Sequence, residues 1–498
     1  IIVWGNNPAS TQVNVLTHIA RARRERNAHL VVVDPYRSGT AKIADTHLML
    51  RPGTDGALAC AIMHVLFRDG YADRDYMQKY SDAPAELEAH LKSRTPQWAA
   101  EITGVPAAEI ERIAMMYGQT KRAFIRVGYG FSRQRNGAAS VHAVSCIATV
   151  GGKWPQRGGG TFYSNGDIYK INDSLIKGTD RIDPRVRILD QSRAGAALTG
   201  DKRDLGEGPP VTAMLIQNTN PAVVCPDSNI VRAGFMREDL FVCVHEQFIT
   251  DTAKYADIVL PATTFLEHDD MYRAGGHSYF QVTRKVIEPY AESRENHYVV
   301  CELARRLGAE HRGFTLSAWE LIDESLRMSG YPDAETLHRE HWLNRQPDFE
   351  RAHFIAGFPT PDGKFRFKPD WKSRGRDFAK MPVLPDYMGA EERADATHPF
   401  KLVTAPARSY LNSTFTETPG SRKREARPTA LVHPDDCTRL GITNGSRIEL
   451  GNARGAVIVH AKIFDGVQPG VIVVESIWPN GAFERGIGIR SEEHTSEL

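Results

Sequence analysis

One pattern occurs twice in this chain, at residues 1–52 and again at residues 213–261. Each copy starts with an apolar run that ends in Asn-Pro, passes through a polar segment into a second apolar run that ends in an acid, and closes with a third apolar run and a proline. Between the second and third runs, both copies carry Thr-Ala-Lys-x-Ala-Asp. Strand, turn, crossover and a strand with a terminal acid form the mononucleotide-binding half of a doubly wound sheet. Two such halves in one chain predict that it binds two nucleotide-bearing groups, or one long group.

The amides and acids of the two copies fall at matching places. A right-handed crossover leaves the Asn-Pro turn and the strand-end acid of each copy together at the carboxyl edge of the sheet. The amide can bond a phosphate or a pterin edge, and the acid can accept from a ribose hydroxyl or from guanine. The alternatives are that each Asn-Pro is a plain turn and that each strand-end acid caps a helix. The acid of the Thr-Ala-Lys-x-Ala-Asp phrase is expected to have a structural role and to pin its loop. The matching pairs are Asn7 and Asn220, Asp34 and Glu246, and Asp45 and Asp257.

Other short motifs are weaker signals. Gly53-Thr54-Asp55 offers bare backbone amides and a carboxylate, and Gly128-Tyr129-Gly130 follows a predicted buried strand. The sequence contains no P-loop, no Gly-x-Ser-x-Gly and no His-Glu-x-x-His, so chemistry is expected from a bound cofactor. No metal ligand is predicted, because the histidines of the second copy fit no standard zinc spacing. These histidines are His245, His268, His277 and His297.

Composition excludes several classes of protein. An apolar content of 41% supports sizeable cores, and 62 Lys plus Arg against 61 Asp plus Glu leave no basic surplus for nucleic acid. No apolar run approaches the roughly 20 residues that span a bilayer. The six cysteines are scattered without a close pair, which is typical of buried thiols in a reducing compartment. We therefore expect a cytoplasmic protein without a membrane span.

Four segments are expected along the chain. Residues 1–200 and 201–397 are predicted to form two α/β domains, with irregular surface structure from about residue 330. Short alternating strands separated by glycines predict a β-barrel at residues 398–489. Both ends are expected to be cut, and residues 490–498 match the translation of a common short-read sequencing adaptor, so they are expected to lie outside the fold.

Two local expectations concern helices of the first unit. Ser10 or Thr11 is expected to cap a helix whose apolar face includes Ile19. Residues 84–118 are expected to form two helices, separated at Thr103-Gly104.

With these motifs assembled, the chain resembles the molybdopterin oxidoreductases of the dimethyl sulfoxide reductase type, over residues 1–489. The resemblance implies an α/β fold with two related doubly wound, Rossmann-like units and a C-terminal six-stranded double-psi-type β-barrel. It also implies one molybdenum or tungsten ion between two molybdopterin guanine dinucleotides, which would account for the repeat. The motifs that carry it are Trp4-Gly5-Asn6-Asn7-Pro8, Val33-Asp34-Pro35-Tyr36-Arg37, Arg51-Pro52-Gly53-Thr54-Asp55, Asn218-Thr219-Asn220-Pro221, Ala256-Asp257-Ile258-Val259-Leu260-Pro261 and His433-Pro434-Asp435-Asp436.

Position by position, the resemblance implies two sets of cofactor contacts. The first dinucleotide would be lined by Trp4, Gly5, Asn7, Asp34, Arg37, Gly53 and Asp55, with Gly130 and Arg133 nearer its pterin. The second would be contacted by Asn220, His245, Glu246 and Glu295. Thr404 and Arg408 resemble the pterin contacts that the barrel supplies.

The chain also departs from the family pattern. The family's iron-sulfur cysteines and its Cys, selenocysteine or Ser metal ligand precede the point where this chain begins, so a 4Fe-4S cluster is expected only in a missing amino-terminal part. Relatives also continue past Gly488-Ile489 at the carboxyl end. Formate-oxidising relatives carry an arginine where this chain has Tyr163-Ser164-Asn165-Gly166. The catalytic residues are therefore left unassigned.

The leading hypothesis is an enzyme for two-electron redox or oxygen-atom transfer on a small substrate, with an electron-transfer subunit or redox protein as a partner. A cofactor-free structural or electron-transfer subunit of a respiratory complex is the alternative. A nicotinamide dehydrogenase is disfavoured, because neither unit has Gly-x-Gly-x-x-Gly after its first strand.

Overall fold

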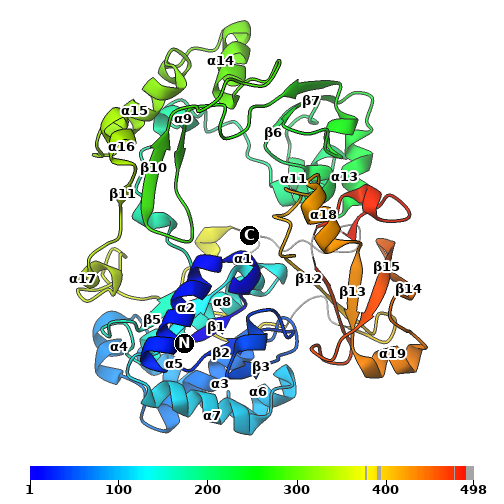
Figure 1. Cartoon of the computed structure of the whole chain (residues 1–498). Coiled ribbons are helices and arrows are strands. Elements are labelled where there is room, and N and C mark those ends of the chain that lie inside the picture. Colours follow the sequence, from blue (N-terminus) through cyan, green and yellow to red (C-terminus); the bar gives the residue numbers. More distant parts are fainter. Residues whose placement is uncertain (376–377, 390–393, 476, 490–498) are drawn as a thin grey trace.

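The computed structural model describes residues 1–375, 378–389, 394–475 and 477–489. It has three parts: a first α/β unit, a second α/β unit and a C-terminal β-rich domain (Figure 1). In that view the first unit lies at the bottom, the second at the top and the C-terminal domain at the right. The predicted α/β class with parallel sheets is confirmed. Among the described helices, none has the length and apolar character that a membrane span needs.

The first unit is built on a five-stranded parallel sheet with the order β3-β2-β1-β4-β5. The order reverses between β1 and β4, and such a switch point is where open α/β sheets bind ligands. The strands are β1 (Ile2–Trp4), β2 (Val31–Val33), β3 (Thr46–Leu48), β4 (Phe124–Val127) and β5 (Gly160–Phe162).

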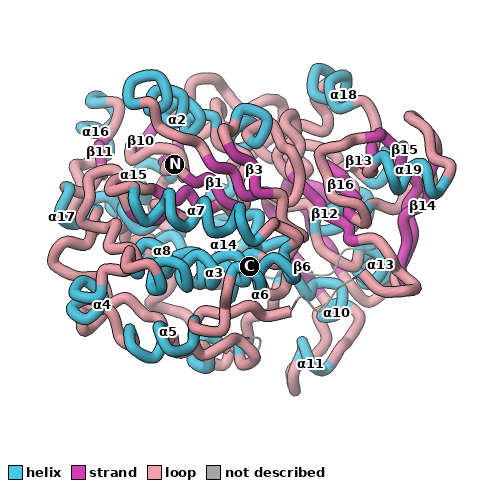
Figure 2. Tube along the Cα trace, turned by 90° about the horizontal axis from the view of Figure 1, so that it is seen from below, coloured by secondary structure: helices cyan, strands magenta, loops and turns pink. Residues whose placement is uncertain are grey.

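Helices cover both faces of this sheet, with α2 on one side and α3, α7 and α8 on the other (Figure 2). On the α2 side, Ile19 packs against Val3 and Val32. Helix α3 lies in the middle of the opposite layer and is therefore apolar on all its sides; Leu58 and Ile62 are almost fully buried, which contributes about 1.5–3 kcal/mol each. The helices are α1 (Pro8–Thr11), α2 (Val13–Arg26), α3 (Asp55–Arg68), α4 (Arg74–Tyr80), α5 (Pro84–Leu91), α6 (Pro96–Thr103), α7 (Ala107–Gln119) and α8 (Gly137–Val150).

Two helix predictions in this unit were wrong. Pro8 starts the separate short helix α1, so the residue before α2 is Gln12 rather than Ser10 or Thr11. The predicted break at Thr103-Gly104 is confirmed, but residues 84–118 lie in three helices rather than two, because the Thr95 side chain caps a further helix that begins at Pro96.

The second unit holds a three-stranded parallel sheet, β6-β7-β8, and an antiparallel sheet, β11-β10-β9. Val231 and Phe235 of α13 pack on Val242 and Val244 of β7. The strands are β6 (Ala213–Gln217), β7 (Phe241–Glu246), β8 (Ile258–Pro261), β9 (Asp270–Tyr272), β10 (Tyr279–Thr283) and β11 (Leu343–Asn344). The helices between β5 and β11 are α9 (Ser174–Lys177), α10 (Ala194–Leu198), α11 (Lys202–Leu205), α12 (Pro221–Val224), α13 (Ser228–Phe235), α14 (Asn296–Leu307), α15 (Ala318–Met328) and α16 (Ala334–Glu340).

After α17 (Phe349–Ala352) the chain returns to the first unit. The backbone N–H of Phe367 donates to Asp82 at 2.8 Å, and Arg94 forms an ion pair with Asp386 at 2.6 Å. Phe367 is fully buried. The expectation of irregular structure is confirmed for this stretch, but its placement on the surface was wrong, since apolar side chains such as Phe367 extend the core of the first unit.

The C-terminal domain is a curled, mixed sheet with the order β12-β16-β13-β15-β14. The described residues supply five strands, where a six-stranded barrel was expected. From the alternating apolar residues between glycines, the sequence predicts strands at residues 401–405, 430–432, 446–450, 456–461 and 471–475. Each observed strand begins and ends within two residues of these positions. The elements are β12 (Lys401–Ala405), α18 (Pro419–Glu425), β13 (Thr429–Val432), α19 (Pro434–Leu440), β14 (Arg447–Asn452), β15 (Gly455–Ile463) and β16 (Val471–Glu475).

Candidate functional site

The two copies of the repeat have the same strand register. The last residue of β1, Trp4, pairs with Val33, and the last residue of β6, Gln217, pairs with His245. The next residues along the second strands are the acids, so Asp34 and Glu246 occupy equivalent positions at the carboxyl edges of the two sheets.

The backbone turns in the same way after the first strand of each copy. Gly5 has a φ of +59° and Asn218, at the equivalent position, has a φ of +55°. This left-handed region favours Gly and Asn. A Cβ on Gly5 would also lie 2.7 Å from the ring of Phe131, so the first copy has room only for glycine.

In both copies the side-chain amide of the Asn-Pro turn bonds to the loop that follows the second strand. Asn7 Oδ1 accepts from the backbone N–H of Thr40 at 3.1 Å and from its hydroxyl at 2.8 Å. Asn220 Oδ1 accepts from Thr252 in the same two ways, at 3.1 and 2.7 Å. Each oxygen is therefore used inside the protein, and each amide holds its turn against the loop that follows the second strand.

The acids of the Thr-Ala-Lys-x-Ala-Asp phrase pin their loops, as predicted. Asp45 accepts from the backbone N–H of Leu30 at 2.8 Å, and Asp257 accepts from that of Val242 at 2.7 Å. The hydrogen bond from Leu30 lowers the pKa of Asp45, and Arg23 adds to this effect. These two acids are structural.

Asp34, which is buried, and Asp55, which is half-buried, lie at the carboxyl edge of the first sheet. Burial raises the pKa of Asp34 to about 7, although a backbone N–H and the Ser38 hydroxyl donate to it at 3.4 and 3.2 Å. Burial also raises the pKa of Asp55 to about 6, against a hydrogen bond of 2.8 Å from the Trp4 indole. The two carboxylates raise each other's energy when both are ionised, and their protein donors are few. Two or more further donors would stabilise them.

The C-terminal domain closes over this edge. Tyr36 donates its hydroxyl to Glu475 at 3.0 Å, and Arg37 pairs with Asp465 while its backbone N–H donates to Gly466 at 2.7 Å. Burial raises the pKa of Glu475 as well. Arg37, expected to line the first dinucleotide, therefore joins the two domains beside that site.

The remaining predicted residues of the first site are spread around the same edge. Gly130 lies so close to β1 that a Cβ would be 2.6 Å from the carbonyl oxygen of Gly5, and Gly53 has a φ of +80° and accepts from Asn136 at 2.7 Å. Arg133 ends the short turn that begins at Tyr129. In the C-terminal domain, Thr404 is buried on β12, and Arg408 is exposed in the loop that follows.

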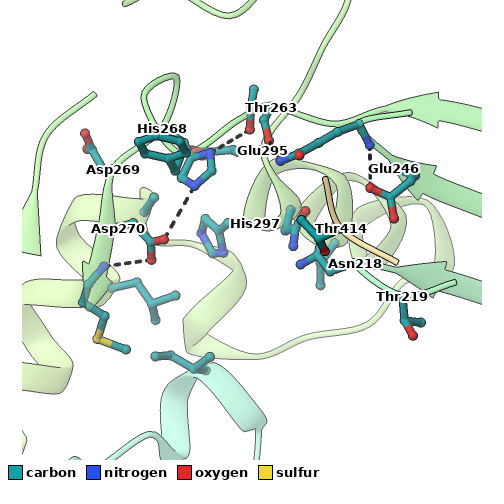
Figure 3. Close-up of a pocket in the computed structure, with 18 of the residues that line it drawn as sticks. Asn218, Thr219, Glu246, Thr263, His268, Asp269, Asp270, Glu295, His297 and Thr414 are labelled. Atoms are coloured by element: carbon teal, nitrogen blue, oxygen red, sulfur yellow. Dashed lines mark hydrogen bonds and ion pairs between the residues drawn. The ribbon is translucent and has the colours of Figure 1, made fainter. Parts of the chain in front are cut away.

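A cavity of about 710 Å³ lies at the equivalent edge of the second sheet (Figure 3). Its volume is in the range of small-molecule sites. Asn220, Glu246 and Glu295 line it, together with Thr414 from the C-terminal domain. The C-terminal domain therefore contributes residues beside both sheets.

Acids and histidines share the far side of this cavity. The Thr263 hydroxyl and one ring nitrogen of His268 are 2.8 Å apart, and the other ring nitrogen lies 3.6 Å from Asp270 (Figure 3). Burial raises the pKa of Glu295, and the nearby His268 and His297 oppose this effect. Glu295 precedes α14, where it makes no capping hydrogen bond within the described chain, so its carboxylate can accept from a ligand.

His245 lies outside the cavity lining. It is fully buried, with one ring nitrogen 3.0 Å from the Gln217 amide and the other 3.0 Å from the carbonyl oxygen of Arg294. Both nitrogens are used inside the protein, so the imidazole fixes Gln217 and the loop before α14.

Sequence reasoning missed several residues at these edges. Thr40 and Thr252 could have been found, because they begin the repeated Thr-Ala-Lys phrase. Asn136 and Glu475 carry no motif, and only the folded chain brings them to the first site. Within the described ranges, no group of three or more His, Cys, Asp or Glu side chains is arranged to hold a metal ion.

Comparison with known proteins gives two family matches. The Molybdopterin oxidoreductase family matches residues 1–306, and the Molydopterin dinucleotide binding domain matches residues 400–496. The chain is 35% identical to Probable oxidoreductase YoaE of Bacillus subtilis, over 96% of this chain and 69% of the relative. It is 26% identical to Dimethyl sulfoxide reductase DmsA of Escherichia coli, over 96% of this chain and 66% of the relative. The chain thus spans about two thirds of the length of these relatives.

Among solved structures, Acetylene Hydratase from Pelobacter acetylenicus matches with a TM-score of 0.77 and 21% identity, over 95% of this chain and 70% of that chain. At this identity the match shows a shared fold.

Proposed function

The chain belongs to the molybdopterin oxidoreductase family, and from this premise we propose that it holds two molybdopterin guanine dinucleotides, one at the edge of each repeated sheet. The observation that carries the proposal is the equivalent placement of Asp34 and Glu246 at the ends of β2 and β7. One strand-end acid for each dinucleotide explains why the pattern occurs twice.

The first edge fits guanine by the chemistry of its donors and acceptors. Guanine presents an N–H and an NH₂ side by side, and a ribose presents hydroxyls, so both groups supply the donors that Asp34 and Asp55 lack. Burial raises the pKa of each acid, and the few hydrogen bonds that the protein donates do not offset this effect. Gly53 would shape the rim, the buried Trp4 would hold Asp55 through its indole N–H, and Arg37 would hold the C-terminal domain closed beside the base.

The second edge would use Glu246, Glu295 and the amide of Asn220 around the cavity. Gly130, Arg133, Thr404 and Arg408 would lie nearer the pterins. The bound group would supply two-electron redox or oxygen-atom transfer at its molybdenum or tungsten ion, acting on a small substrate. The residues of this chain would bind it, orient it and exclude water from it.

We further propose that the metal ligand, a 4Fe-4S cluster and an electron-transfer partner belong to the complete protein, which would be cytoplasmic. A cofactor-free subunit of the same fold is disfavoured by the buried acids of the first edge. Acids kept in a dry site without enough donors cost stability, and an empty fold gains nothing from them.

Calorimetric titration of the purified chain with GDP and ADP tests the proposal. GDP should bind at least tenfold more tightly than ADP, because adenine offers no pair of donors to a carboxylate and a charge-assisted bond contributes about 1.5–3 kcal/mol. Affinity for GDP should rise as the pH rises towards 7, since binding favours the ionised form of Asp34. Equal affinity for the two nucleotides would contradict the proposal.

A further inference from the structure

Arg126 is a buried cation at the carboxyl end of β4. Its relative exposure is 3%, and it pairs in register with Val3, one residue before β4 ends. Arginine is almost never this deeply buried unless it is paired with an acid. Asp436, another buried charged residue, follows that rule through its ion pair of 2.7 Å with Arg439.

Among the described residues, the guanidinium of Arg126 meets only neutral acceptors. One terminal nitrogen donates to the carbonyl oxygens of Val127, of Phe162 at 3.1 Å and of Tyr163 at 2.8 Å, and the other donates to Gln12 Oε1 at 2.8 Å. The group also lies over the ring of Phe162, 4.9 Å from its centroid. In the part of the chain that the structure describes, its Nε has no hydrogen-bond partner and no carboxylate forms an ion pair with it.

An uncompensated charge in a dry site is costly. Burial accordingly lowers the pKa of Arg126, and only the hydroxyl groups of Tyr129 and Tyr163 act in the opposite direction. A neutral amide could donate to the same carbonyl oxygens without this cost. The contacts that Arg126 makes with the described residues thus do not explain its positive charge.

The position of Arg126 indicates what would balance it. It lies on the β4 side of the switch point between β1 and β4, where dinucleotide folds place the diphosphate of their ligand. Gln12, which bonds Arg126, also accepts from Asn6 at 3.0 Å, so the cation is tied to the turn after β1. The backbone is bare at this point, because Gly5 and Gly128 approach each other without side chains.

We propose that Arg126 is the fixed counter-charge for the diphosphate of the first dinucleotide, and that Gln12 transmits its position to the turn after β1. This inference rests on the proposed function but is tested separately from it. Arg126 acts as a positioning residue: its charge attracts the diphosphate, and Asp34 selects the base.

The experiment compares GDP with guanosine, by calorimetric titration of the purified full chain. The wild-type chain should bind GDP at least tenfold more tightly than guanosine at the first site. In Arg126→Gln this ratio should fall below threefold, while the affinity for guanosine stays unchanged. Arg122→Gln is the matched control, since Arg122 is exposed at the opposite end of β4 and its loss removes the same charge. It should keep the wild-type ratio.

A second measurement keeps the test valid if Arg126→Gln is less stable than the wild type. Inorganic pyrophosphate should raise the melting temperature of the wild type and of Arg126→Lys, which keeps the charge, and should leave that of Arg126→Gln unchanged. An unchanged GDP-to-guanosine ratio in Arg126→Gln, or equal stabilisation of all three proteins by pyrophosphate, would overturn the inference. Loss of the preference for GDP over ADP would instead count against the proposed function, so the two failures are distinguishable.

Discussion

Replacing Asp34 with Asn should make the ligand-free chain more stable at neutral and basic pH. The pKa of Asp34 is raised from 3.8 to about 7 in the folded chain, chiefly by burial. Between these values the folded state holds a proton that the unfolded state has lost, so the wild-type stability falls as the pH rises from about 4 to about 7. At 1.36 kcal/mol for each pH unit, a shift of about 3 units costs about 4 kcal/mol above pH 7.

Urea denaturation of Asp34→Asn and of the wild type at pH 4, 6 and 8 measures this effect. The variant should gain nothing at pH 4 and should gain up to about 4 kcal/mol at pH 8. Asp45→Asn is the control of opposite sign: the pKa of Asp45 is lowered, so its contribution is present at neutral pH and is lost as the pH falls through its folded pKa. A stability difference for Asp34→Asn that does not depend on pH would refute the reasoning.

Two further predictions concern the repeated turns, and both are measured by thermal and urea denaturation. Gly5→Ala should destabilise the chain by more than about 1 kcal/mol, because of the left-handed φ and the clash with Phe131; Asn218→Gly should be within about 0.5 kcal/mol of the wild type. Thr40→Val and Thr252→Val should each cost about 1–3 kcal/mol, since each removes one of the two donors to the oxygen of an Asn-Pro amide, which is half-buried at Asn7 and buried at Asn220. If the two variants lost clearly different amounts of stability, the loops that contain Thr40 and Thr252 would be held by different interactions.

The repeat was enough to predict both parallel sheets and the equivalence of Asp34 and Glu246, because strand alternation and the strand-end acid are local features. The local surroundings of these acids were not predictable. Asp34 is fully buried under the C-terminal domain, whereas Glu246 lines an open cavity. That difference arises from contacts such as Tyr36 with Glu475, which join residues far apart in the sequence.

Long-range packing also accounts for the other misses. The stretch around Phe367 has a polar sequence, and only its return to the first unit makes it part of a core. The role of His245 as a cofactor contact stays a prediction, and one of its ring nitrogens lies against the carbonyl oxygen of Arg294 in the loop before α14. Residues 490–498, expected to lie outside the fold, are outside the described residues.

The number of guanine nucleotides bound by one chain tests the central claim most directly. Equilibrium dialysis with GDP at saturating concentration should give two per chain, and Asp34→Asn and Glu246→Gln should each remove one of them while the other keeps its affinity. Binding of a single nucleotide, or the loss of both sites in either variant, would contradict the assignment of one dinucleotide to each copy of the repeat.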